Sequence, residues 1–126
     1  MSSLLEGSRP GEFLLSEAPG TLSRDNATVT VPAGTTYPAG LVLGKITATG
    51  KHVAYDNGAS AGEGDAAVGV LYAALQNAGA APADLKGVII NLNAEVRLAD
   101  LNWNGQQEAA ITAGIADLLT KNIKCR

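Results

Sequence analysis

The chain has 126 residues, with nine lysines and arginines against twelve aspartates and glutamates, and a formal net charge of −3. This length is typical of one domain, and the absence of any basic run argues against nucleic-acid binding through phosphate contacts. Aromatic residues make up only 4% of the chain, whereas glycine and alanine are abundant. Small side chains predict a thin core with closely approaching backbones, which self-association would help to complete.

Cys125 is the single cysteine, so no intrachain disulfide can form. Residues 1–7 carry neither a charged leader nor a long apolar run, and we expect a chain that is made and assembled in the cytoplasm. The longest apolar runs, such as residues 68–75, are too short to span a bilayer. No membrane partner is therefore expected.

Residues 1–26 are predicted to form an extended N-terminal arm. Within it, between two proline–glycine pairs, lies a short apolar segment made of Glu12, Phe13, Leu14, Leu15 and Ser16. Its pattern fits neither a helix stripe nor a clean strand alternation. It either adds a strand to the sheet of a partner or forms the first strand of the domain's own sheet, and the spacing favours neither. On the first interpretation, the rest of the chain folds without residues 1–18.

From Ala27 onward the pattern becomes that of a small β domain. Strands are expected over 28–31, 41–48, 52–55 and 67–73, followed by two strands or one bent strand over 87–92 and 94–98. A turn at Asp56-Asn57-Gly58 leads into a glycine- and alanine-rich loop that extends to Gly64, and a second loop is expected over 76–86.

The C-terminal segment is predicted to be helical. Apolar residues at helical spacing there are Ile111, Ile115, Leu118, Leu119 and Ile123. Asn104 can cap the helix with Gln107 three residues later, and Lys121 and Lys124 suit a last turn, where the helix dipole favours cations. The fold class is thus mainly β with a C-terminal α-helix (α+β), a small β domain over 27–126 preceded by the arm.

The sequence shows no catalytic constellation. His52, the only histidine, has no metal-spaced cluster around it and is predicted to be an exposed strand residue. The loop carboxylates of Asp56, Glu63 and Asp65 lack the ligand pattern of an EF-hand, and Ser60 lacks a nucleophile elbow. We therefore expect no enzyme activity, no cofactor and no metal site.

Three residues outside the arm are candidates for an interface. Glu95 and Arg97 are expected on one face of a strand, where they either pair with each other or meet a partner. Trp103 is expected to lie over the first turn of the helix, and a partner contact is the second interpretation, because tryptophan is enriched at interface anchors.

Several segments, taken together and in order, resemble a known family. They are residues 11–18, 20–24, 38–45, 51–56, 67–71, 88–96 and 101–103. In these segments the chain is similar to the tailed-phage head decoration proteins of the lambda protein D type. It departs from the family pattern in having Asn104 where a proline follows Trp103, and in its Cys125-Arg126 terminus.

The resemblance implies a homotrimer on the outer surface of an expanded phage head, at local three-fold positions, made in the host cytoplasm. There it would clamp neighbouring major capsid proteins against internal DNA pressure, with the N-terminal arm pairing with capsid strands. That role falls on Glu12 to Ser16, with Phe13, Leu14 and Leu15 as apolar anchors. The alternative is a small β domain that binds carbohydrate or a host surface, although such sites usually display aromatic platforms and this chain has few aromatics.

Overall fold

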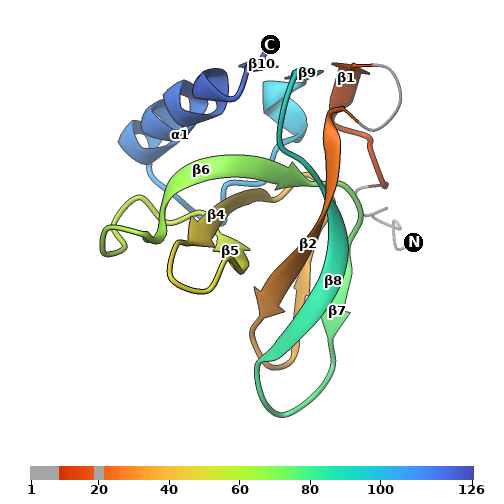
Figure 1. The fold of residues 1–126 in the computed structure, drawn as a ribbon, viewed down its shortest axis with the longest axis vertical. Coiled ribbons are helices and arrows are strands. Elements are labelled where there is room, and N and C mark those ends of the chain that lie inside the picture. Colours follow the sequence, from red (N-terminus) through yellow and green to blue (C-terminus); the bar gives the residue numbers. More distant parts are fainter. Residues whose placement is uncertain (1–8, 19–21) are drawn as a thin grey trace, which may run out of the picture.

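The computed structural model describes residues 9–18 and 22–126, so residues 1–8 and 19–21 of the expected arm lie outside it. The described chain is mostly β-strand with an α-helix near its C-terminus, which confirms the predicted fold class (Figure 1). In chain order the elements are β1 (Leu14–Glu17), β2 (Arg24–Val31), β3 (Thr35–Tyr37), β4 (Val42–Ile46), β5 (His52–Ala54), β6 (Glu63–Leu71), β7 (Leu75–Asn77), β8 (Ala83–Ile90), β9 (Ala94–Val96), the 3-10 helix η1 (Leu98–Asp100), α1 (Glu108–Thr120) and β10 (Ile123–Cys125).

Five strands close into a small barrel in the order β2-β5-β4-β6-β8, and β8 pairs back with β2. The β2–β8 pair is antiparallel and continuous, from Arg24 opposite Ile90 to Val31 opposite Ala83. β4 runs antiparallel to both β5 and β6. The closure is uneven, since β2 joins β5 only at Val29 opposite His52, and β6 joins β8 at two residue pairs.

A second, three-stranded sheet lies beside α1 at one end of the barrel, at the top of Figure 1. Its order is β1-β9-β10, with β1 antiparallel and β10 parallel to the central strand β9. A segment from near the start of the chain thus lies beside two segments from its last third. α1 packs against β6 and β10, and the carboxylate of Asp117 accepts a hydrogen bond of 3.1 Å from the backbone N–H of Ala67.

The buried apolar side chains form two clusters. The first lies between the three-stranded sheet, α1 and the barrel, and its members are Phe13, Val42, Tyr55, Ala67, Val70, Ile90, Ala94, Val96, Leu101, Leu118 and Ile123. The second belongs to the barrel and β3, and its members are Val29, Val31, Tyr37, Leu41, Leu43, Leu71 and Ile89. Burial of this apolar surface is the main favourable contribution to folding.

Backbones approach closely, as the small-residue composition predicts. A β-carbon on Gly44 in β4 would lie 2.5 Å from the Cα of Gly64 in β6, and one on Gly69 would lie 2.9 Å from the carbonyl oxygen of Ile90. No other residue fits at such positions without a backbone shift. Glycine therefore sets the spacing between these barrel strands.

The helix starts and ends differently from the sequence expectation. Its N-cap residue is Gln107, without a side-chain cap, whereas Asn104 adopts φ +52° in the turn before it, so the predicted Asn104 cap is wrong. Lys121 is the C-cap residue, and Asn122, at φ +57°, redirects the chain. Asparagine tolerates this left-handed conformation, which lets the chain leave the helix and pair with β9.

Ile123 and Lys124 consequently lie in β10 rather than in the last turns of the helix. The buried helix positions are Ala110, Gly114 and Leu118, spaced four residues apart. The buried face of the helix therefore contains smaller residues than the predicted apolar stripe. Leu119, a residue of that predicted stripe, is 56% exposed. Small residues are needed on this face because aromatic rings fill the space in front of it.

Those rings belong to Tyr55 and Trp103. Their centroids lie 6.0 Å apart at an interplanar angle of 74°, an edge-to-face arrangement. A β-carbon on Gly114 would lie 2.5 Å from Cζ3 of Trp103, so the indole lies over the middle of α1 and not over its first turn as expected. The Tyr55 hydroxyl donates a hydrogen bond of 2.7 Å to the carbonyl oxygen of Ala110.

Two segments expected to be loops contain strand. β6 begins at Glu63, inside the glycine- and alanine-rich segment, and the last two residues of β7 and the start of β8 lie within 76–86. The boundary expected between residues 26 and 27 falls inside β2, whose first residue Arg24 pairs with Ile90. These strands consist largely of polar or small residues, so they lack the apolar alternation by which a strand is predicted from sequence. Backbone pairing with a neighbouring strand stabilises them instead.

Candidate functional site

The apolar segment of the arm divides into a buried and an exposed part. Phe13 is only 1% exposed and belongs to the first core cluster, and Leu14 packs against that cluster. Glu12, Leu15 and Ser16 are exposed, Leu15 by 45%. The expectation that Phe13 is an anchor against a partner is thereby corrected, because its own domain already encloses the ring.

The same segment forms the edge of a sheet. Ser16 lies opposite Glu95 and Glu17 opposite Ala94 in the antiparallel β1–β9 pair, which confirms the interpretation of β1 as a strand of the domain's own sheet. Within residues 9–18 and 22–126, β9 is the only strand that pairs with β1. The other edge of β1 therefore presents backbone N–H and C=O groups to which a further strand can be added.

A polar row crosses the outer face of this sheet. Ser16 on β1, Glu95 on β9 and Lys124 on β10 occupy matching positions. Together with Asn93 and Asn122 they line a shallow pocket of about 240 Å³. The structure thus brings the predicted site residues Ser16 and Glu95 together on the surface that borders the free edge.

The expected pairing of Glu95 with Arg97 is wrong. Glu95 pairs instead with Arg126, with 3.1 Å between Oε2 and Nε, and Arg97 lies 3.8 Å from the carboxylate of Asp100. The physical reason is that β9 ends at Val96, so that Arg97 turns into η1 rather than continuing along the strand. Both pairs are largely exposed and contribute little to stability.

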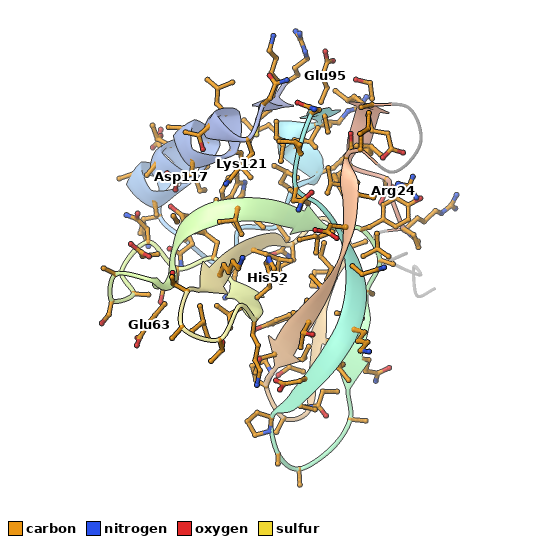
Figure 2. The ribbon with its side chains drawn as sticks, in the orientation of Figure 1. Arg24, His52, Glu63, Glu95, Asp117 and Lys121 are labelled. Carbon is orange, nitrogen blue, oxygen red and sulfur yellow. The ribbon has the colours of Figure 1, made fainter. Side chains whose placement is uncertain are left out.

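A clamp around Arg24, which the sequence analysis missed, fixes β1 to the barrel. The guanidinium of Arg24, which Figure 2 labels, donates hydrogen bonds to the Glu17 carboxylate from Nε at 2.9 Å and from Nη2 at 2.6 Å. It also lies 4.3 Å from the centre of the Tyr72 ring. These contacts lower the pKa of Glu17 and raise that of Arg24. The backbone N–H of Gly11 also donates to the Tyr72 carbonyl at 2.9 Å.

His52 is buried, which corrects the prediction of an exposed strand residue. It is 9% exposed, and its Nδ1 has no hydrogen-bond partner among the residues that the structure describes. Burial and then the neighbouring charge of Lys45 lower the pKa of His52, while the backbone of Thr28 and the charge of Asp25 act in the opposite direction. Register explains the proximity, since Lys45 lies directly opposite His52 in the β4–β5 pair.

We expect the burial of His52 to make the protein less stable in mild acid. Because the folded-state pKa lies below the unfolded value, the unfolded chain binds the proton more readily, and stability falls as pH drops through about 6.5. Thermal unfolding should give a lower Tm at pH 5 than at pH 7.5, above the range where Glu17 and Asp84 titrate. The His52→Gln variant should show a flatter dependence, and an unchanged slope would contradict this prediction.

Among the residues that the structure describes, we find few other features that are typical of a catalytic site or of a membrane-spanning segment. They contain no group of three His, Cys, Asp or Glu side chains that could hold a metal ion. The pKa of the half-buried Cys125 thiol is raised by desolvation, which disfavours the reactive thiolate. None of the described helical segments is long and apolar enough to cross a bilayer.

The fold is a small β domain with one helix, and its candidate contact with other proteins is the free edge of a sheet. Over residues 3–123 the chain matches the family described as bacteriophage lambda head decoration protein D. It therefore belongs to that family of phage head decoration proteins, as the resemblance in its sequence implies. A comparison with curated proteins finds no match.

Proposed function

We propose that the protein binds the outer surface of an expanded phage head as a homotrimer at three-fold positions, and stabilises the head against internal DNA pressure. Its partners are then the major capsid protein and two further copies of itself, without nucleic acid, membrane or catalysis. The family supports the capsid role. The observation that carries the mechanism is the free edge of β1, beside the exposed side chains of Glu12, Leu15 and Ser16.

In this mechanism a capsid strand adds to β1 through backbone hydrogen bonds. The apolar side chain of Leu15 then loses its exposure, while Ser16 and Glu95 contact polar groups at the rim. Phe13 and the Arg24–Glu17 pair hold β1 in place before binding, which reduces the entropy lost on association. Three such edges on one trimer bind together, so that modest single contacts give a high avidity.

A carbohydrate-binding role finds less support. Phe13, Tyr37 and Tyr55 are buried, and Tyr72 and Trp103 pack against the first core cluster. No aromatic ring in the described residues is therefore left as an open platform for a sugar. A glycan array with the purified protein separates the two functions, because the proposed capsid role predicts no sugar-dependent binding.

We expect Leu15→Ser to lower the number of copies bound per head. Complete burial of an exposed leucine side chain contributes about 1.5–3 kcal/mol, and Leu15, which is 45% exposed, can gain roughly half of that on binding. Three linked contacts amplify its loss. Purified expanded heads without decoration are mixed with each variant at matched concentration, and bound copies are counted by quantitative gel electrophoresis. Leu119→Ser is the matched control, since Leu119 is 56% exposed but lies on α1. Equal occupancy for both variants would remove β1 from the contact.

A further inference from the structure

A groove on the barrel has no assigned role in the proposed capsid contact. It encloses about 920 Å³ and is lined from β2, β4, β5, β6 and β8 and from the segments after β8 and α1. Leu22, 65% exposed, and Leu92, 42% exposed, form part of its apolar wall, and His52 lies in it. Exposed leucines beside a concave surface are typical of a protein–protein contact.

The groove also carries unpaired positive charge. Arg24 is neutralised by Glu17, and Asp25 accepts a hydrogen bond of 3.4 Å from Asn91. Lys45 and Lys121 also line the groove, and neither ammonium has a carboxylate partner in the part of the chain that the structure describes. With Asp25 counted against them, the groove keeps an excess of positive charge on a protein whose net charge is −3.

The complementary chemistry lies on another part of the same chain. Residues 56–65 contain Asp56, Glu63 and Asp65 and no lysine or arginine. The loop itself ends at Gly62, since Glu63 and Asp65 belong to the start of β6. Between Asp56 and Glu63 it consists of asparagine, serine, glycine and alanine, so it is thin enough to enter a groove. None of residues 56–65 lines the groove, although Glu63 lies opposite Ile46, the neighbour of Lys45 on β4. The loop of one chain does not fill its own groove.

We infer that the groove receives the loop of residues 56–62 of a second copy of the chain, with Asp56 and the adjoining β6 residues Glu63 and Asp65 meeting Lys45 and Lys121. This inference rests on the self-association in the proposed function and assigns it a surface. A contact between two different surfaces is heterologous and closes into a ring when the rotation between copies is right. In a closed ring each copy contributes one loop and one groove, so every loop and every groove is occupied.

Zero-length carbodiimide cross-linking tests the contact, because it joins only carboxylates and amines that touch. A mixture of nitrogen-14 and nitrogen-15 protein is cross-linked free at high concentration and bound to expanded heads, then digested and analysed by mass spectrometry. We expect mixed-isotope peptides that join Lys45 or Lys121 to Glu63, Asp65 or Asp56. The charge reversal Lys121→Glu should lower their yield at least about tenfold, and adding Glu63→Lys should restore the association. Glu108→Gln, at the exposed start of α1, is the control and should leave the yield unchanged.

The outcomes separate this inference from the proposed function. Normal decoration of heads without these mixed-isotope links, or with Lys45 and Lys121 joined to capsid peptides instead, overturns the loop-in-groove contact and leaves the capsid role intact. Failure of the protein to bind heads overturns the proposed function, and the free-protein sample then decides the inference alone. Mixed-isotope links there support the contact, and their absence refutes it.

Discussion

Replacing Phe13 by alanine is expected to lower the free energy of unfolding by about 3–5 kcal/mol, the range for a fully buried phenylalanine. The ring is 1% exposed and contacts a cluster built from the three-stranded sheet, α1 and the barrel. Its removal leaves a cavity where three parts of the fold meet. Thermal unfolding followed by circular dichroism should show a fall in Tm of roughly 10 °C or more.

Leu15→Ala is the matched control for this prediction. Leu15 lies two residues away but is 45% exposed, so its truncation should change stability by less than about 1 kcal/mol. Equal losses in the two variants would place Phe13 outside the core. The same burial implies that removal of residues 1–18 destabilises the domain, whereas the arm interpretation of the sequence expects the remainder to fold unaided.

Gly44→Ala is expected to destabilise the protein by about 3 kcal/mol, at the upper end of overpacking effects. The added methyl group would lie 2.5 Å from both the Cα and the carbonyl oxygen of Gly64 on the neighbouring strand β6. Backbone atoms cannot turn aside as a flexible side chain can, so the two barrel strands must separate. Urea unfolding measures the loss as a lower midpoint with a similar m-value.

Gly58→Ala provides the comparison, because the nearest atom to its added methyl group is the Asp56 Oδ1 at 3.5 Å, an ordinary contact. We expect it to change the free energy of unfolding by no more than about 0.5 kcal/mol. Identical midpoints for the two variants would show that β4 and β6 adjust freely, and would contradict the interpretation of Gly44 as the residue that sets their spacing.

The sequence predicts the fold class and the main apolar strands because alternating or continuous apolar residues mark them directly. It does not predict β7 or the polar start of β2, since backbone pairing to β3 and β8 holds those strands without an apolar pattern. The chain end is also misjudged. Ile123 continues the helical spacing of apolar residues. The chain nevertheless turns at Asn122, and the residues after it pair with β9 as a strand.

The candidate site shows the same limit. Apolar content marks Phe13, Leu14 and Leu15 as one group, yet only tertiary packing separates the buried Phe13 from the exposed Leu15. His52 is similar, since a lone histidine next to a lysine suggests solvent, whereas barrel closure buries it. The Arg24–Glu17 clamp joins residues on separate strands, so no local sequence pattern predicts it.

The order of the three-stranded sheet has a consequence for synthesis on the ribosome. β1 is made early, but its neighbour β9 begins at Ala94 and β10 at Ile123. At translation rates of about 5–20 residues per second, β1 waits several seconds for its neighbour. During that time its apolar side chains have no core and both of its edges are open. This sheet therefore assembles only after β9 and β10 have been synthesised, and chaperone binding during translation should concentrate on residues 13–17.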